Sequence, residues 1–234
     1  MVAKKIYVSP SDQAGNTYAY GNTNEMVQCQ KIAGLLVTAL ERCGFEAKTS
    51  YEQGEQAMYN RVKESNAWGA DLHLCIHTNA FNTQVTGTRI FYYTKPGRSY
   101  DAAKAVYDAL APITPGKSDN ITPKPQFYEM YRTAAPAVYV EAEFHDNVDA
   151  AKWIVENGQT IAACICKGVC NYYGVPYTEA EQEAPKQEIA AMYRVINEQD
   201  NRQIGAFRNL DNALNMAKNQ LLEGKDVCLT VREE

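Results

Sequence analysis

The segment DLHLCIHTNAF, residues 71–81, alternates apolar and polar side chains up to His77 and then breaks off in Thr78, Asn79 and Ala80. A period of two predicts a β-strand, and short polar residues after it predict the turn that ends the strand. A strand that stops in this way can aim the imidazole of His77 into a cleft. Neutral imidazole is a common zinc ligand, so this segment suggests a site.

Working outward from this strand, strand-like and helical patterns alternate along the first three quarters of the chain. We expect strands at 6–9, 45–50, 71–77, 88–93 and 137–144, and helices at 24–43, 54–68, 99–110 and 148–173. Such alternation favours an α/β fold: a mixed, mostly parallel sheet flanked by helices on both faces. Sites in these sheets form beyond the carboxyl ends of the strands, where His77 and Glu141 are expected.

The C-terminal quarter has a different pattern. Residues 178–190, TEAEQEAPKQEIA, are charged, contain Pro185 and lack an apolar period, so they predict a linker. Residues 191–234 then read as strand, turn, strand, helix and strand. We therefore expect a main domain at 1–177, a linker at 178–190 and a small α+β domain at 191–234.

Composition narrows the function classes. A net charge of -5 with scattered Lys and Arg disfavours nucleic acid as a partner. No apolar run approaches a bilayer span, so membrane insertion is not expected, and the start MVAKKIYVSP leads into a strand instead of the apolar region of a signal peptide. The seven cysteines are expected to be buried free thiols. Cys166 and Cys170 lie one helical turn apart, but no second pair at zinc spacing accompanies them, so no structural zinc knuckle is predicted.

Two glutamates are candidates for chemistry beside His77. Glu25 opens the first long helix, where a carboxylate is favoured by the helix dipole; it is either a simple N-terminal charge or a metal ligand. Glu141 lies inside the strand AVYVEAEF, where a buried carboxylate is costly unless it is paired, metal-bound or protonated. Glu143 has the same parity and would face solvent only if the strand twists or ends. His73 is interpreted either as a core histidine or as a residue that hydrogen-bonds to a metal ligand and orients it.

Several motifs occur together in the order of a known family. CIHTNAF (75–81), PAVYVEAEFHDN (136–147), and Arg61 and Asn66 within NRVKESNAWGADLHL (60–74) resemble the zinc-dependent N-acetylmuramoyl-L-alanine amidases, type 3, over residues 4 to 175. The resemblance implies one zinc ion held by two histidines and a glutamate. Glu25 and His77 would be ligands, and Glu141 would be the catalytic glutamate.

The implied activity is peptidoglycan hydrolysis at the bond between muramic acid and L-alanine. Zinc would polarise the amide carbonyl and acidify its water, while Glu141 takes the water's proton and later protonates the leaving amine. The implied partner is bacterial peptidoglycan, and the implied place of action is the bacterial cell wall. Without a signal peptide, we expect a phage-type lysin acting in cell lysis, release by lysis, or a chain from which a leader was trimmed.

One ligand of the family pattern is absent. The family has Asp-Pro-Gly-His where this chain has Ser9, Pro10, Ser11 and Asp12, followed by Gln13. Asp12 can ligate zinc through its carboxylate, and Gln13 offers a weaker amide oxygen. His145, four residues after Glu141, is either a replacement ligand or a surface histidine. A third alternative is a degenerate metal site in a non-catalytic peptidoglycan-binding or regulatory protein.

Two further positions and the C-terminal domain complete the expectations. Asn79 is expected to orient the turn that bears His77, and Arg61 to form a salt bridge, pin a loop or bind a substrate carboxylate. VINEQDNRQIGAF (195–207) weakly resembles part of a SPOR-type peptidoglycan-binding repeat, which implies wall binding or homo-oligomerisation; a structural extension without a ligand is the alternative. A zinc peptidase acting on stem peptides is the rival enzyme.

Overall fold

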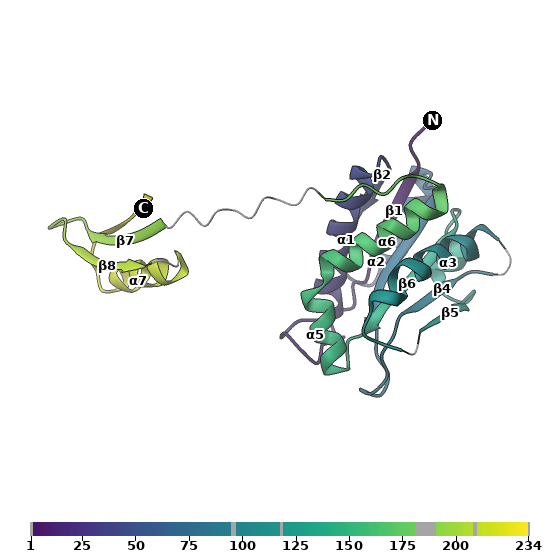
Figure 1. The fold of residues 1–234 in the computed structure, drawn as a ribbon, viewed down its shortest axis with the longest axis horizontal. Coiled ribbons are helices and arrows are strands. Elements are labelled where there is room, and N and C mark those ends of the chain that lie inside the picture. Colours follow the sequence, from purple (N-terminus) through teal and green to yellow (C-terminus); the bar gives the residue numbers. More distant parts are fainter. Residues whose placement is uncertain (1, 95–96, 118, 181–190, 208–209, 234) are drawn as a thin grey trace. The chain divides into compact units, whose positions relative to one another are not determined.

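The computed structural model describes residues 2–94, 97–117, 119–180, 191–207 and 210–233. The chain forms two compact units, Met1–Ala180 and Glu181–Glu234, and each is described by itself (Figure 1). Most of the predicted linker, residues 181–190, lies outside the described residues. No helix in the described ranges is long and apolar enough to cross a lipid bilayer.

The first unit is built on a six-stranded sheet with the order β2-β1-β3-β6-β4-β5. β4 pairs with β6 antiparallel, and the other neighbours in this sheet pair parallel. This confirms the predicted mixed, mostly parallel α/β fold. The strands are β1 (Lys5–Pro10), β2 (Glu46–Thr49), β3 (Leu72–Asn79), β4 (Arg89–Tyr92), β5 (Asn120–Pro123) and β6 (Ala137–Phe144).

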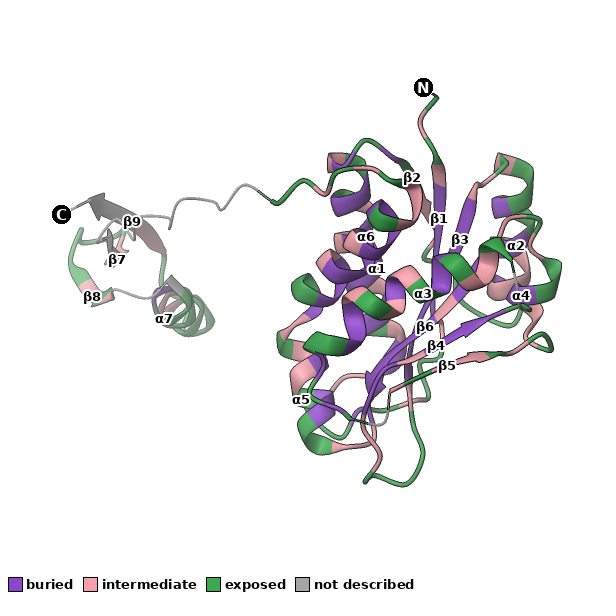
Figure 2. Ribbon diagram, turned by 45° about the vertical axis from the view of Figure 1, so that its right-hand side comes forward, coloured by how far each residue is buried: buried purple, intermediate pink, exposed green. Residues whose placement is uncertain are grey.

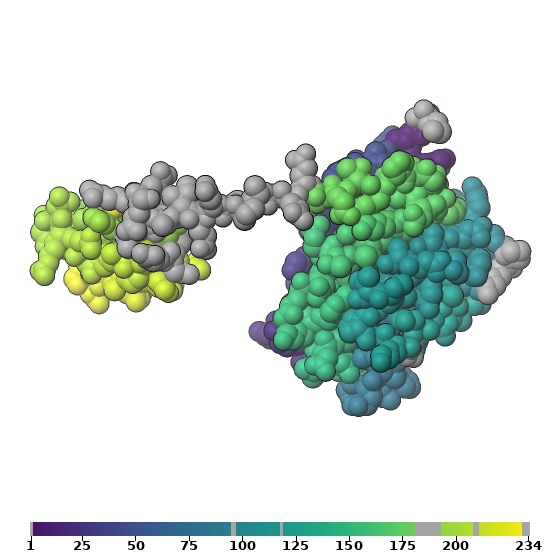
Figure 3. Space-filling view, viewed as in Figure 1, coloured from purple at the N-terminus to yellow at the C-terminus, as the bar shows by residue number. Residues whose placement is uncertain are grey.

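Helices cover both faces of this sheet, as predicted. Figure 2 shows α2 and α4 on the side of the sheet opposite α1 and α6, and Figure 3 shows α6 and α3 side by side on one surface. The bounds are α1 (Glu25–Arg42), α2 (Ala57–Trp68), α3 (Arg98–Leu110), a 3-10 turn (Ala111–Ile113), α4 (Tyr128–Arg132), α5 (Val148–Glu156) and α6 (Gly158–Tyr173).

The helix predicted at 24–43 is confirmed as α1, and side-chain and backbone hydrogen bonds define both of its ends. The Asn24 side chain accepts a hydrogen bond from the backbone N–H of Val27 at 3.0 Å, which caps the first turn. At the other end, the backbone N–H of Cys43 bonds to the carbonyl of Ala39, and Gly44 follows at φ +85°, a conformation that favours glycine. These caps fix Glu25 at the N-terminus of α1.

The C-terminal part of the first unit corrects the prediction of one helix over 148–173. The helix breaks at Asn157, whose backbone leaves the helical region and whose side-chain amide donates to the carbonyl of Trp153 at 2.8 Å. α6 then starts at Gly158. An asparagine side chain that competes for a backbone carbonyl ends α5, whereas the apolar period alone runs through this point. The segment that follows α3 has four prolines, at positions 112, 115, 123 and 125, which indicate a loop; it also contains β5 and α4, which the sequence did not predict.

The two faces of the sheet bury different chemistry. One face carries apolar side chains that pack under α1, α3 and α6: Ile6, Val8, Leu72, Leu74, Ile76, Val138 and Val140. The face under α2 and α4 carries Ser9, His73, Cys75 and Tyr139. Because side chains alternate along a strand, His77 belongs to this second, polar face.

The second unit is a three-stranded antiparallel sheet with the order β8-β7-β9 and one helix. Its elements are β7 (Ala191–Asn197), β8 (Gln203–Phe207), α7 (Leu210–Leu222) and β9 (Val227–Glu233). The predicted sequence of strand, strand, helix and strand is confirmed. Val195 and Ala213 are fully buried, so this unit has a small core of its own.

Candidate active site

His77 and Glu25 form the centre of the site. β3 carries His77 near its carboxyl end, and α1 begins with Glu25, so strand and helix bring the two side chains together. The Nδ1 atom of His77 lies 2.8 Å from Oε1 of Glu25, and both residues are buried. The structure thus brings together the two residues that the family resemblance implies as zinc ligands.

Gln13 and Asn16 join this pair from the loop that follows β1. The Gln13 amide nitrogen lies 3.5 Å from Nδ1 of His77. Asn16 donates from its amide nitrogen to Oε1 of Gln13 at 2.9 Å and to Oε2 of Glu25 at 2.6 Å. Gln13 thus stands beside His77 and Glu25, and Asn16 ties the loop to the start of α1.

The pKa values of the pair move in opposite directions. Burial alone lowers the pKa of His77, but the hydrogen bond to Glu25 and the charge of Glu141 raise it above its ordinary value. Burial alone raises the pKa of Glu25, but the hydrogen bond to His77 and its charge lower it. Each partner stabilises the charged form of the other.

Glu141 lies next to His77 on the neighbouring strand. β3 and β6 pair in parallel with His77 opposite Glu141. The Oε2 atom of Glu141 is buried and has no hydrogen-bond partner among the described residues. Burial raises the pKa of this carboxyl group to about 8, against the lowering effect of His77. A carboxyl group whose pKa lies near neutrality is suited to exchange protons with a substrate or with water.

Glu143 has a different environment, because the β3–β6 register shifts between His77 and Asn79. This irregularity breaks the simple alternation between Glu141 and Glu143. The Glu143 carboxylate is also buried but accepts backbone N–H bonds from Gly87 at 2.7 Å and Gly116 at 2.8 Å. Glu143 therefore anchors two loops, and Glu141 retains an unpaired oxygen.

A cavity of about 580 Å³ opens beside His77. Its wall includes Asp12 and Arg61, whose Oδ1 and Nη2 atoms lie 3.6 Å apart. The Tyr139 ring stacks on the His77 imidazole with the centroids 4.3 Å apart. The cavity therefore combines a charged pair with aromatic surfaces, which suits a ligand with both polar and apolar parts. Its aromatic lining is Tyr59, Phe127, Tyr128 and Tyr139.

A buried polar network supports the wall of this cavity. Arg61 donates to the Ser9 hydroxyl at 2.9 Å, and this hydroxyl donates to Oε1 of Glu129. The same Glu129 oxygen lies 3.2 Å from Nε2 of His73, and Nδ1 of His73 lies 3.0 Å from the Ser65 hydroxyl. Burial would raise the pKa of Glu129, but His73 holds it at about 2.

The other candidate residues lie apart from the pair. Asp12 is directed to Arg61. His145 stacks on Tyr18, and its Nδ1 atom lies 3.0 Å from the Thr78 hydroxyl. Asn79 accepts a bond from the N–H of Ala80 at 2.8 Å, within the turn after β3. Neither Asp12 nor His145 completes a three-donor group with Glu25 and His77 among the described residues.

Tyr139 and Asn16 are among the site residues that the sequence analysis missed. Tyr139 has the strand parity of Glu141, so the period of β6 contained the signal that it would face the site. Asn16 lies in an irregular polar loop, where no periodicity tells which amide points inward. His73, interpreted as a core or supporting histidine, is fully buried in the polar network.

The donor set accommodates a zinc ion with one weak ligand. Glu25 and His77 are ordinary zinc ligands that already converge, and the unpaired oxygen of Glu141 marks a place where a polar group is missing from the hydrogen-bond pattern. The third nearby group is the amide of Gln13, whose nitrogen faces His77 and whose oxygen accepts from Asn16; only that oxygen could ligate zinc, and it binds zinc less strongly than imidazole does.

At its carboxyl edge, this mostly parallel α/β sheet holds an imidazole–carboxylate pair and a buried carboxyl group with a raised pKa, a set of groups that can carry out acid–base chemistry. A family profile described as N-acetylmuramoyl-L-alanine amidase matches residues 10–171. The chain belongs to this family, which is generally zinc-dependent and hydrolyses peptidoglycan. The enzyme class and the fold class predicted from the sequence are thereby confirmed.

The chain is also similar to individual amidases, in sequence to one and in fold to others. The chain is 23% identical over 237 residues to the N-acetylmuramoyl-L-alanine amidase CwlM of Bacillus licheniformis, and the match covers 98% of this chain and 85% of CwlM. The fold is similar to the catalytic domain of CwlV from Bacillus (Paenibacillus) polymyxa, with a TM-score of 0.66, 19% identity, and coverage of 74% of this chain and 99% of that one. AmiC2 of Nostoc punctiforme gives a TM-score of 0.66 at 19% identity, over 73% of this chain and 97% of its own.

Proposed function

We propose that the site of Glu25, His77 and Glu141 cleaves the amide bond between N-acetylmuramic acid and L-alanine in bacterial peptidoglycan. The observation that carries this proposal is the environment of Glu141. Its carboxyl group lies opposite His77, is buried with an unpaired oxygen, and has a pKa raised to about 8. Such a group is poised to take a proton from water and to give one back to a leaving amine.

In this proposal, Glu25, His77 and the amide oxygen of Gln13 hold the zinc ion. When bound, zinc polarises a carbonyl group and lowers the pKa of water. Asn16 fixes Glu25 and Gln13 relative to each other through its two hydrogen bonds. Asp12 is proposed to keep Arg61 in place instead of binding the metal, because the two are already paired.

The remaining residues position the substrate. Arg61 lines the cavity and is almost fully buried, so its guanidinium offers a fixed positive charge to a carboxylate of the stem peptide. The aromatic side chains of the wall provide flat surfaces for the sugar. Glu141 would transfer the proton of the attacking water to the nitrogen of L-alanine.

The C-terminal unit is proposed to bind the cell wall, where the enzyme acts. Its order of strands and helix agrees with the weak SPOR-like resemblance of 195–207, but its small core favours function as an appended module over function by itself. Homo-oligomerisation through this unit stays a prediction from the sequence.

Gln13 favours a second candidate function. If an amide oxygen is too weak a ligand, the site holds no metal and the protein binds muropeptides without cutting them. A zinc peptidase would share the metal but release a different amine.

Zinc content separates these functions. We expect the full chain, dialysed after zinc loading, to hold about one zinc per protein more than the His77→Ala variant, with any zinc bound elsewhere common to both. His77→Ala should remove that zinc, and His145→Ala should keep it, since His145 is bonded to Thr78 instead. Zinc that survives His77→Ala but is lost in His145→Ala would contradict the assignment of ligands. A wild-type site that never takes up zinc would favour the binding module.

A further inference from the structure

Three cysteines from distant parts of the first unit meet at one end of α6. Cys43 ends α1, and Cys166 and Cys170 lie one turn apart on α6. All three sulfur atoms lie within 4.8 Å of one another, and the Sγ atoms of Cys166 and Cys43 are 3.7 Å apart. Sequence spacing indicated only Cys166 and Cys170, because the third thiol comes from a residue 123 positions away.

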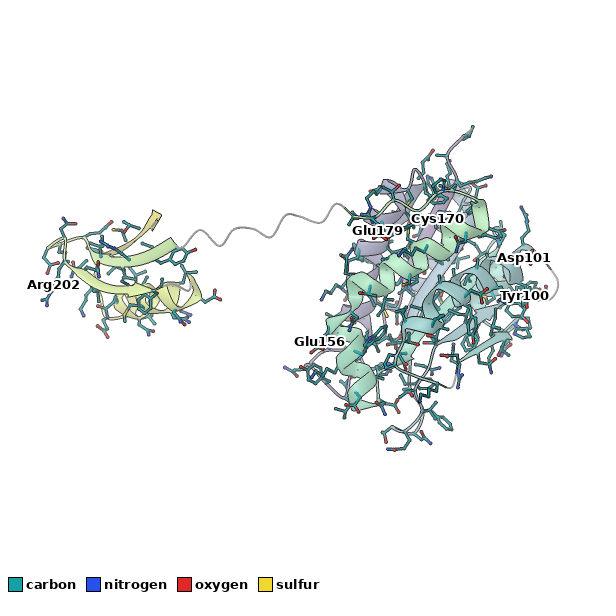
Figure 4. The ribbon with its side chains drawn as sticks, in the orientation of Figure 1. Tyr100, Asp101, Glu156, Cys170, Glu179 and Arg202 are labelled. Carbon is teal, nitrogen blue, oxygen red and sulfur yellow. The ribbon has the colours of Figure 1, made fainter. Side chains whose placement is uncertain are left out.

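The segment after α6 closes over this cluster. Gly174 ends the helix in a left-handed conformation, and the N–H of Val175 returns to the carbonyl of Cys170 at 2.9 Å. The backbone N–H of Thr178 then donates to Sγ of Cys43 at 3.3 Å. Figure 4 labels Cys170 and Glu179 at this end of the unit. A backbone N–H directed at sulfur stabilises negative charge on that sulfur.

Arg42 holds the same segment from the position next to Cys43. Arg42 precedes Cys43 and donates from Nε to the Thr178 carbonyl at 3.0 Å. Its Nη2 atom is buried and has no hydrogen-bond partner among the described residues. A buried guanidinium donor without a partner is costly unless negative charge nearby offsets it.

Two of the three thiols resist ionisation because they are buried. Burial, with contributions from the neighbouring sulfur atoms, raises the pKa of Cys166, and burial and Cys43 raise that of Cys170 to about 12. Only a ligand that binds sulfur strongly enough to displace protons would use them together. A disulfide would use two of the three sulfurs and leave the third unexplained.

We propose that Cys43, Cys166 and Cys170 bind a thiophilic d10 metal ion, of which Zn²⁺ is the common example. Each thiol loses its proton to solvent, three sulfur–metal bonds form, and no electron is transferred. Three protein sulfurs leave one position of a tetrahedral ion for water. The ion joins the end of α1 to α6 and to the segment 175–178, so its role is structural. This inference does not depend on the proposed amidase activity.

A second cluster in the same unit is a poorer metal site. His73, Cys75 and Glu129 also bring three donor atoms within 4.8 Å. However, His73 and Glu129 are already hydrogen-bonded to each other. His73 also bonds to Ser65, and Glu129 bonds to Ser9, which accepts from Arg61 as well. The hydrogen-bonding groups of His73 and Glu129 therefore have partners without a metal, and the positive charge of the nearby Arg61 guanidinium would repel a metal cation.

Cadmium provides the test, because thiolate–Cd²⁺ bonds absorb in the ultraviolet and the donors proposed at the active site include no sulfur. The reduced full chain is titrated with Cd²⁺. We expect the ultraviolet absorbance to rise by the amount expected for three thiolate–Cd²⁺ bonds, and to level off at about one Cd²⁺ per cluster. Cys166→Ser should weaken this binding at least about tenfold, equivalent to 1.4 kcal/mol. Cys164→Ser is the matched control, since Cys164 lies on the same helix outside the cluster and should leave the titration unchanged.

Thiol labelling makes the test independent of variants that fail to fold. Wild-type protein is alkylated in mild denaturant with and without Cd²⁺, and the sites are mapped by mass spectrometry. Protection of Cys43, Cys166 and Cys170, with Cys29 and Cys164 unprotected, supports the site. Absence of thiolate absorbance, a Cys166→Ser titration like that of the wild type, or protection only at Cys75 overturns it.

Discussion

His77 and Glu141 lie directly opposite each other on the parallel strands β3 and β6, and only His77 has a close carboxylate partner, Glu25. This difference separates the two glutamates: the pKa of Glu25 is lowered, while burial raises that of Glu141 to about 8. Pairs of carboxyl groups with opposed pKa shifts are typical of sites that divide acid–base work from charge stabilisation. Glu25 suits a ligand role, and Glu141 suits proton transfer.

Glu141→Gln should remove activity without unfolding the protein. Losing the proton-transfer group typically costs about 10² to 10⁴ in rate. Because Oε2 of Glu141 has no hydrogen-bond partner among the described residues, the amide breaks no bond at that atom. We expect a melting temperature equal to or above that of the wild type, measured by circular dichroism beside the hydrolysis assay. Activity near the wild-type level would show that another group moves the proton.

Gln13→His should strengthen zinc binding. The Gln13 amide lies beside His77, and imidazole is a better zinc ligand than an amide oxygen. We expect the zinc dissociation constant to fall by about tenfold or more, equivalent to 1.4 kcal/mol, in a competition titration with a chelator. The same change at Gln126, which also lines the cavity, is the matched control. Equal effects at both positions would place the metal elsewhere.

Glu129→Gln should destabilise the protein in a pH-dependent way. The folded pKa of Glu129 is about 2 against an ordinary value of 4.5, so its contribution is fully present above about pH 4.5 and is lost as the pH falls towards 2. A shift of this size corresponds to about 3 kcal/mol of unfolding free energy at neutral pH. Urea unfolding at several pH values measures it. A wild-type-to-variant difference that stays constant down to pH 2 would show that the ionised Glu129 carboxylate is not the source of this stability.

Much of the fold follows from periodicity, because the strands and long helices bury regular apolar faces. The helix that begins at Glu25 has both a capping asparagine and a terminal glycine, so its limits were predictable. The break at Asn157 was not, since it depends on one side chain bonding to one carbonyl. β5 and α4 were missed because four prolines indicated only a loop.

The site was predictable only in part, for a similar reason. Regular helices and strands contain three of the site residues, His77, Glu25 and Glu141. In such elements, the position along the helix or strand determines the direction in which a side chain points. Gln13 was a candidate only through the family pattern, and Asn16, which bonds to both Gln13 and Glu25, lies in an irregular loop whose geometry has no period. The different fates of Glu141 and Glu143 depend on a register shift that only the pairing of β3 with β6 shows.

Gly168→Ala tests the packing of α6 on α3. A Cβ atom at Gly168 would lie 2.8 Å from the carbonyl oxygen of Ala105 and would also overlap the Val106 backbone. Since backbone cannot move aside cheaply, we expect a loss of about 1 to 3 kcal/mol in unfolding free energy. Gly158→Ala on the same helix is the control, because its Cβ would meet side chains no closer than 3.7 Å. If the Gly168→Ala and Gly158→Ala variants had equal unfolding free energies, α6 and α3 would be able to move apart at little cost in free energy.

The most direct test of the proposed activity is product analysis. The zinc-loaded full chain is incubated with a purified muropeptide, and the products are identified by mass spectrometry and by labelling of new amino groups. We predict a free amino group on L-alanine and an intact N-acetylmuramic acid, with both products absent for Glu141→Gln and His77→Ala. A new amine on any other residue of the stem peptide, or no cleavage by zinc-loaded wild-type protein, would contradict the amidase assignment.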